Sequence, residues 1–378
     1  QQMKIVKFIT YVLFITLIGT FLTTCSSGGG GGNDSNILDE ATFYNGARPE
    51  PQNVTFTDAG NNSITILAYP GEIFLAVTPE TAVSNVQTLA QQNGGTILSQ
   101  IPELGIYLIQ VTVGNEATFI AAVRTNPAVL YVSPNPVLIM KTLVDLSDTG
   151  KTDPSDLVVA LISSPDPTAD VILAQLEGSD ANHRSVVEDE LDLITGPKNK
   201  LQVNVETSCG SLPFKCSSGD AMARGLAAVI AGAEMNNQKV AINMSYGPFY
   251  SAYNETDYND NSKALASLEA SWKAILSPLA ASEWARQGNV FLGIAAGNRD
   301  VQLYGLNPST NKYELQNSRP IDKSNVFNNL SASSLLSQVM QNNLIFCGAL
   351  WNSALYNAAD GDVVQADGTL AQYSSYGN

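Results

Sequence analysis

Apolar and polar positions between residues 61 and 140 follow two alternating patterns. Short apolar runs predict strands, and stretches with apolar residues at every third or fourth position predict helices. The expected elements are a strand at 72–77, a helix at 79–94, two strands within 95–111, a helix at 115–127 and a strand at 128–139. This order, β-α-β-β-α-β, predicts a small ferredoxin-like α+β domain in which two helices cover one face of an antiparallel sheet.

A second pattern begins at about residue 155 and continues to residue 378. Near-continuous Val, Ile and Leu runs, as expected of strands buried on both faces, alternate with longer amphipathic stretches. The expected strands are 157–163, 201–207, 240–247, 290–298 and 344–350, and the expected helices are 183–194, 218–238 and 267–288. This alternation predicts an α/β domain built on a doubly wound parallel sheet, with ligands bound beyond the carboxyl ends of its strands.

The amino-terminal residues have the pattern of an export signal. Lys4 and Lys7 precede an apolar run at 8–22 that is short for a membrane span but typical of a signal-peptide core. The sequence LTTC, which ends at Cys25, resembles the lipid-attachment box of bacterial lipoproteins. We therefore expect residues 1–25 to be a lipoprotein signal with lipid on Cys25. Residues 26–60 then form a flexible tether, Gly-rich at its start, that holds the protein at the outer membrane or cell surface.

Composition narrows the classes of function. The chain has 378 residues, 44% hydrophobic and 14% charged, which suffices for about two domains with apolar cores. Its net charge of −16 repels nucleic acids, so no nucleic-acid partner is expected. No G-x-G-x-x-G follows the first expected strand and no Walker sequence is present, which removes the main support for nucleotide binding. The sequence has a single His and no cluster with zinc-ligand spacing, so no metal ligands are assigned.

Three cysteines remain after Cys25. In an exported protein, an odd remainder suggests one disulfide and one buried thiol. Cys209 and Cys216 flank a short Pro-containing loop that a disulfide can close, whereas Cys347 lies in an apolar run typical of a core strand.

Two phrases of the small domain carry a family resemblance. LGIYLIQV at 104–111 and VRTNPAVLYVSPN at 123–135 resemble the inhibitory prodomain of subtilisin-like serine proteases. In that family the prodomain assists folding of the catalytic domain, and its carboxyl-terminal extension lies in the active-site cleft until it is cut. The resemblance implies that the segment after Ile139 runs into such a cleft. Taken alone, the small domain is also compatible with an unrelated ferredoxin-like adaptor.

Motifs of the large domain resemble the catalytic domain of the same subtilase family. VAINMSYG is similar to the family's substrate-binding strand, which implies that Ser245 and Gly247 line the cleft. FLGIAAGN is similar to the oxyanion segment, which implies that the Asn298 side chain donates to the developing oxyanion. A contact of that kind is worth roughly 3–4 kcal/mol in subtilisin. A simple Gly-Asn turn is the plainer explanation of Asn298.

Two members of a Ser-His-Asp triad have candidates. His183 stands where the family keeps its general base, although Arg184 beside it departs from the family's Gly. A lone His is more often structural, but its place in the series of motifs favours catalysis. The family's Asp comes directly at the end of the first strand, whereas Asp166 stands three positions late. It therefore completes the triad only if that strand end bulges.

The nucleophile is expected beyond the printed sequence. Ser374 and Ser375 lie in the turn that comes before it in the family, so the Ser would follow Asn378. The two residues before Met3 and the abrupt end indicate part of a longer reading frame. As it stands, the chain would be inactive.

The main hypothesis is an exported, lipid-anchored subtilase zymogen that hydrolyses peptide bonds by acyl transfer. Its expected partners are a peptide or protein substrate, its own prodomain in the cleft, and a membrane through the lipid anchor. It requires no cofactor. Two long insertions at 248–263 and 299–329 are candidates for shaping the cleft or holding structural calcium, although such stretches are more often solvated loops.

Two other functions remain open. One is a pseudoprotease, a surface lipoprotein that binds peptides after losing its catalytic Asp. A carboxylate of Asp166 near His183 favours the enzyme, and a solvent-facing Asp166 favours this binder. The other is an extracellular solute-binding lipoprotein, which needs no prodomain and leaves the strand end at Asn298 unexplained.

Overall fold

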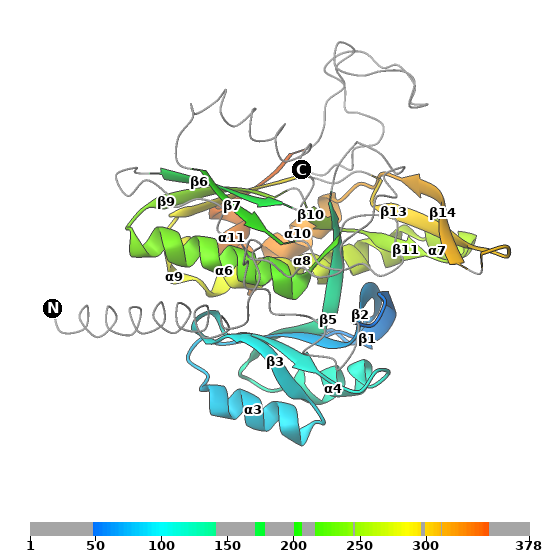
Figure 1. The fold of residues 1–378 in the computed structure, drawn as a ribbon, viewed down its shortest axis with the longest axis horizontal. Helices are drawn as coiled ribbons and strands as arrows, with labels where there is room; N and C mark the ends of the chain where they lie inside the picture. The colour runs from blue at the N-terminus through cyan, green and yellow to red at the C-terminus, as the bar shows by residue number, and fades with distance from the viewer. Residues whose placement is uncertain are drawn as a thin grey trace, which may run out of the picture. The chain divides into compact units, whose positions relative to one another are not determined.

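The computed structural model describes residues 48–140, 171–177, 200–205, 216–244, 246–295, 299–310 and 312–347. All of them belong to one unit of the chain, Asp39–Asn378. They form a small domain at 48–136 and a large domain at 171–347, joined through a shared strand (Figure 1). Within these segments, no helix has the length and apolar character needed to cross a membrane.

The small domain is built on an antiparallel sheet. Its elements are β1 (Gln52–Thr57), β2 (Ser63–Val77), α3 (Val83–Gln92), β3 (Thr96–Ile101), the 3-10 turn η1 (Pro102–Leu104), β4 (Ile106–Gln110), α4 (Glu116–Val123) and β5 (Val129–Met140). The strands pair in the order β5-β2-β4-β3, and β1 pairs with the first half of β2. The order β2-α3-β3-β4-α4-β5 agrees with the order expected from the sequence.

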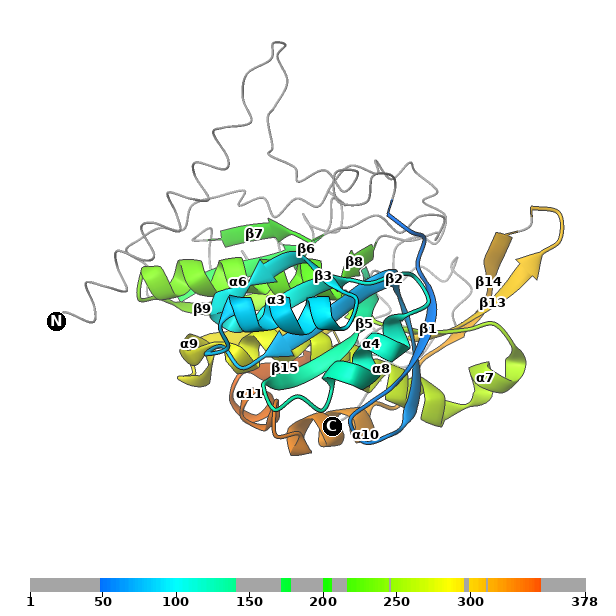
Figure 2. The same ribbon diagram turned by 90° about the horizontal axis from the view of Figure 1, so that it is seen from below.

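Helices α3 and α4 cover the same face of this sheet (Figure 2). Val86 of α3 and Phe119 and Ile120 of α4 share a core with Ile73 and Leu75 of β2. Successive side chains of a strand point to opposite faces, so every second residue of β2 is left for the other face. The apolar run at 73–77, which follows Glu72, is therefore continuous because the sheet is covered on both faces.

Several small-domain boundaries differ from the sequence expectation, among them that of β2, which begins at Ser63 rather than at Glu72. Strand β1 lies inside the range expected as tether, because Val54 and Phe56 alternate with less buried residues and pack on β2. Helix α3 begins at Val83 rather than near Pro79, because Thr81 N donates to the Thr78 carbonyl (2.9 Å) and closes a turn. The tether interpretation is therefore wrong for 52–57.

The large domain contains a five-stranded sheet in which every pairing is parallel, in the order β15-β12-β9-β6-β7. Its strands are β6 (Val171–Glu177), β7 (Lys200–Asn204), β9 (Lys239–Met244), β12 (Val290–Ala295) and β15 (Leu344–Cys347). The described helices are α6 (Gly219–Met235), α7 (Glu255–Asn259), α8 (Asn261–Ala281), α9 (Glu283–Arg286), α10 (Ser324–Ala332) and α11 (Ser337–Asn342). The core of this domain joins β-strand residues such as Ile242 and Leu292 to Trp272 of α8.

The sequence pattern does not predict β6, which lies between β7 and β9 in the sheet. Its apolar run is interrupted by Gln175, whose side chain is buried. The strand expected at 157–163 and the helix expected at 183–194 lie outside the described residues.

The two insertions contain regular structure, so the expectation of solvated loops is wrong for most of their length. The first begins at the last residue of the short strand β10 (Tyr246–Pro248) and carries the short strand β11 (Tyr250–Ala252) and helix α7. The second carries an antiparallel hairpin of β13 (Val301–Asn307) and β14 (Lys312–Arg319), followed by α10. Strand β11 pairs with β13, because Val301 and Leu303 are apolar and become buried there.

Helices α6 and α8 form the interface between the two domains and lie between the parallel sheet and the small-domain sheet (Figure 1). Phe74, Ala76 and Ile106 of the small-domain sheet cluster with Ala223 of α6 and Ala274 of α8. The short Ala side chains let the helices approach the sheet closely.

Two polar contacts link the domains beside this apolar cluster. The Tyr131 hydroxyl donates to the Ala270 carbonyl (2.6 Å), and burial raises the pKa of Tyr131 above its usual range. The Ser99 hydroxyl of β3 donates to Oδ1 of Asp220 in the first turn of α6 (2.8 Å). The interface is thus held by hydrogen bonds as well as by apolar burial.

Candidate functional site

The last residues of β5 leave the small-domain sheet and continue between two short strands of the large domain, β8 (Cys216–Ser218) and β10. Both pairings are antiparallel: Val137↔Ser218, Leu138↔Ser217 and Ile139↔Cys216 on one side, and Leu138↔Pro248, Ile139↔Gly247 and Met140↔Tyr246 on the other. We call residues 137–140 the tail, and β8 with β10 the strand-binding site. The strand-binding site therefore pairs with an extended segment along both edges of that segment.

This arrangement can bind peptides of varied sequence, because main-chain groups supply the pairing and side-chain surroundings supply the selectivity. Gly247, expected from the sequence to line a cleft, lies opposite Ile139 in the site. The segment after Ile139, which the resemblance places in a cleft, lies outside the described residues except for Met140, which pairs with Tyr246. Sequence reasoning misses strand β8, because three residues are too few to show an alternation of apolar and polar side chains. Its only sequence signal is its position directly before α6.

A buried polar network fixes β5 just before it enters the strand-binding site. Arg48 donates to both carboxylate oxygens of Glu72 (Nε to Oε1, 2.7 Å; Nη2 to Oε2, 2.5 Å), and its guanidinium lies 3.5 Å from the Tyr69 ring centroid. Asn135 Nδ2 donates to Glu72 Oε2 (2.6 Å), while Asn135 Oδ1 accepts from the backbone N–H of Asp220 (3.0 Å). Asn135 therefore connects the small-domain carboxylate to the amino-terminal turn of α6.

The carboxyl ends of three neighbouring parallel strands meet beside this site. Strands β6, β9 and β12 are adjacent, with Leu176↔Met244 and Ile294↔Met244 in register. In the sequence, His183 follows β6, Ser245 follows β9 and Asn298 follows β12. These three residues lie outside the described residues, but the strands that lead to them end at one edge of the sheet, where ligands of open α/β sheets bind.

The chain just after β12 is fixed by a buried ion pair. Arg299 has a positive φ of 49°, and Asp300 follows it. The Asp300 carbonyl accepts from Tyr250 N (2.7 Å), and its carboxylate contacts Lys323 Nζ at 2.5 Å, with both side chains fully buried. This segment is therefore tied to β11 and to the start of α10.

Two carboxylates are candidates by position for the acidic residue of the triad that the resemblance implies. Asp166 lies outside the described residues and precedes the start of β6 at Val171. Strand β6 ends at Glu177, so Glu177, rather than Asp166, lies at the strand end that leads toward His183. The sequence signal for it is a carboxylate directly after an apolar run.

Cys216 is buried and disulfide-bonded. Its expected partner, Cys209, lies outside the described residues, as does Cys25. Within the described part of the chain, no group of His, Cys, Asp and Glu residues is arranged to hold a metal ion.

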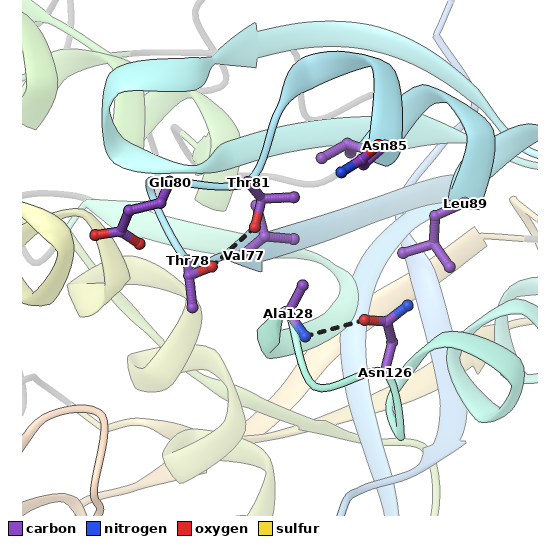
Figure 3. Close-up of a pocket in the computed structure, with 9 residues that line it drawn as sticks. Val77, Thr78, Glu80, Thr81, Asn85, Leu89, Asn126 and Ala128 are labelled. Carbon is purple, nitrogen blue, oxygen red and sulfur yellow. Dashed lines mark hydrogen bonds between the residues drawn. The ribbon is translucent and has the colours of Figure 1, made fainter.

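A separate pocket of about 390 Å³ lies on the small domain (Figure 3). Thr78 and Thr81 hydroxyls are 2.8 Å apart, and Ala128 N donates to Asn126 Oδ1 (2.9 Å), so polar groups of the pocket bond to one another. Its described lining holds one ionisable side chain, Glu80. The pocket lacks the converging acid, base and nucleophile of a hydrolytic site.

Comparison with known proteins adds one sequence match. Residues 70–135 match the family model described as the fervidolysin N-terminal prodomain. This range runs from the middle of β2 to the residue before Pro136 in β5. The small domain is therefore similar to a protease prodomain. None of the curated proteins matches the chain significantly.

Seven chains of solved structures match. One is the epidermin leader peptide processing serine protease (EpiP) from Staphylococcus aureus, with 10% sequence identity and a TM-score of 0.33. The match covers 61% of this chain and 61% of that protein, so this chain spans less than two thirds of its length.

Proposed function

We propose that the chain is the precursor of an exported serine endopeptidase of the subtilisin type, with the small domain as its inhibitory prodomain. One observation carries the proposal: the tail lies as an antiparallel strand between β8 and β10. A peptide substrate bound in the same place would present its backbone beside the strand ends that precede His183, Ser245 and Asn298. The match of 70–135 to a protease prodomain family supports the proposal.

In this proposal the large domain, residues 155–378, is a doubly wound subtilisin-like domain. His183 takes a proton from a nucleophilic Ser supplied by the full-length gene product, and Asn298 donates to the oxyanion. Glu177 or Asp166 orients the His. The Ser oxygen bonds to the scissile carbonyl carbon, the amine leaves with the proton from His183, and water then hydrolyses the acyl-enzyme.

The amino-terminal part of the proposal concerns location. Residues 1–25 direct export, Cys25 carries lipid in a bacterial host, and the chain is anchored at the outer membrane or cell surface. A disulfide between Cys209 and Cys216 fits that oxidising compartment. The proposal needs no cofactor, and structural calcium remains compatible with it.

The full-length gene product tests the catalytic proposal. A fluorophosphonate probe should label its Ser, and the His183→Ala variant should lose labelling while keeping the wild-type melting temperature. Amino-terminal sequencing should place processing after Met140 and before Val171, because the tail is held in the site and β6 begins the parallel sheet. Labelling that is unchanged in His183→Ala would refute the proposed mechanism.

A second candidate is a pseudoprotease that binds peptides without cutting them. The observation that favours it is the position of Asp166 before β6 rather than at the end of that strand. This candidate predicts binding of extended peptides by a full-length product that the probe does not label.

A further inference from the structure

Apolar side chains cover the face of the tail that points away from the large-domain core. Their cluster consists of Leu67, Tyr69, Val137, Ile139, Cys216, Phe249 and Tyr304, with the partly buried Leu315 at its margin. Leu67 and Tyr69 belong to β2, and Val137 and Ile139 to the tail. Phe249 and Tyr304 belong to the large domain, so they would stay in place after removal of the small domain.

Ile139 occupies a position in which its side chain meets large-domain groups. Its neighbour across β10 is Gly247, which has no side chain, and its neighbour across β8 is Cys216. The Ile139 side chain is 6% exposed, and Phe249 and Tyr304 are each 2% exposed. Because Gly247 has no side chain, the Ile139 side chain packs against this apolar cluster rather than against a cross-strand neighbour.

Tyr304 is held firmly in this cluster. Its hydroxyl donates to Gln302 Oε1 at 2.5 Å, and its ring centroid lies 6.0 Å from that of Tyr253. Strand β13, which carries Tyr304, is paired on one side with β11 and on the other with β14. The satisfied hydroxyl and the paired strand leave the ring as a fixed apolar surface.

We propose that Phe249 and Tyr304 form a specificity subsite that selects an aliphatic side chain at the substrate position now filled by Ile139. The inference rests on the proposed peptidase function and names its substrate class. Leu138, next to Ile139, lies in the large-domain core on the opposite face and is fully buried. The favoured substrate is therefore an extended segment with consecutive apolar residues, such as unfolded exported proteins expose.

The size of the preference follows from burial. Moving an Ile side chain from water into such a cluster is worth about 1.5–3 kcal/mol, so Ile should be favoured over Ser by roughly tenfold to a hundredfold. An Asp at this position should be rejected more strongly, because the apolar side chains around it offer no counter-charge.

The test uses the processed full-length product and labelled peptides with the sequence of Val132–Met140 extended by a cleavable linker. The peptides differ only at the Ile139 position, which carries Ile, Val, Ser or Asp. Cleavage is measured as kcat/KM and binding by fluorescence anisotropy. Tyr304→Ala and Phe249→Ala remove the subsite, and Tyr313→Ala is the matched control on the same hairpin, since Tyr313 is 54% exposed.

We expect the Ile-to-Ser ratio of kcat/KM to be about tenfold or more, and to fall toward unity in Tyr304→Ala but not in Tyr313→Ala. Equal cleavage of all peptides by the wild type overturns the subsite and leaves the peptidase function standing. Binding with the expected ratio but no cleavage supports the subsite and refutes the peptidase function. Peptides that are neither bound nor cut overturn both. If Tyr304→Ala does not fold, Phe249→Ala and the wild-type peptide series decide the matter.

Discussion

Lys323 Nζ lies 2.5 Å from Asp300 Oδ2, and neither side chain has exposed surface. Burying two charges costs solvation energy that their attraction repays only in good geometry, so such a pair is weak evidence for stability and better evidence for a fixed position. The pair joins the segment after β12 to the start of α10. We infer that it fixes the chain from Arg299 onward, directly after Asn298 in the sequence.

Lys323→Met should destabilise the protein by about 3–5 kcal/mol, because it leaves the buried Asp300 carboxylate without its partner. The loss is measured by urea denaturation. The matched control is Lys263→Met, which breaks the exposed Lys263–Asp257 pair (2.5 Å) and should change stability little because solvent screens that pair. An unchanged unfolding midpoint for Lys323→Met would contradict this role.

Gly219→Ala should loosen the tail without unfolding the large domain. A Cβ at Gly219 would lie 2.7 Å from Pro136 Cδ and 3.1 Å from Asn135 Oδ1, so the first turn of α6 would push β5 away. Limited proteolysis should cut the tail faster than in the wild type. Gly232→Ala in the same helix meets nothing within 4 Å and should stabilise it by up to about 1 kcal/mol. Equal tail protection in both variants would count against the docking described here.

Asn135→Ala should weaken domain docking by about 1–3 kcal/mol, because it leaves the Asp220 N–H and one Glu72 oxygen without their Asn135 partner inside the interface. Differential scanning calorimetry should show an earlier transition. Asn126→Ala, which removes one hydrogen bond to Ala128 N in a surface loop, is the control and should shift the transition less. Equal shifts would show that the network does not hold β5.

Glu177→Gln should lower kcat of the full-length product by roughly 10⁴-fold if Glu177 orients His183, as loss of the triad carboxylate does in serine proteases. Asp166→Asn should then have little effect. We expect this order because β6 ends at Glu177, on the edge of the sheet where β9 and β12 also end. A large loss of activity in Asp166→Asn and a small one in Glu177→Gln would identify Asp166 as the acid. Full activity in both variants would show that neither carboxylate orients His183.

The start of α8 should lose stability in acid. Asp260 Oδ1 accepts hydrogen bonds from Ser262 N (3.0 Å) and Lys263 N (3.3 Å). The pKa of Asp260 lies below its usual 3.8, mainly because its carboxylate also accepts a hydrogen bond from the Ser262 side chain. A carboxyl group whose pKa is lower in the folded state stabilises the fold at pH values above its unfolded-state pKa. That stabilisation is lost as the pH falls through its folded-state pKa. Asp260→Asn keeps a capping oxygen but no charge.

Melting temperatures of Asp260→Asn and the wild type should therefore differ most near neutral pH and converge below pH 3.8. A constant difference across that range would show that the Asp260 charge does not stabilise α8.

Much of the fold follows from side-chain patterns. Ile73 and Leu75 face the α3 and α4 core while Phe74 and Ala76 face α6 and α8, which explains why β2 reads as one apolar run. Strand β6 escapes prediction because Gln175 breaks its run. The pattern of apolar and polar residues along a strand indicates which of its two faces are buried. It fails to indicate a strand where a polar side chain such as that of Gln175 is buried.

The candidate site is less predictable, because main-chain pairing creates it. Gly247 is found through its motif, whereas β8 has no motif and is recognised only by its pairing with Val137, Leu138 and Ile139. His183, Asn298 and Asp166 lie outside the described residues and stay predictions. The resemblance of the small domain to a prodomain agrees with the matched range of 70–135.

Strand β5 belongs to the small-domain sheet and to the strand-binding site at once. In the proposed zymogen, the lifetime of the blocked state would therefore be tied to the unfolding rate of the small domain. While its sheet is intact, the tail would stay in the strand-binding site and compete with a peptide as if it were present at very high local concentration. Cleavage beyond Met140 would leave the tail in place. Release of the tail would require thermal unfolding of the small domain or its digestion by a protease. The rate of that step would set the delay before activity begins.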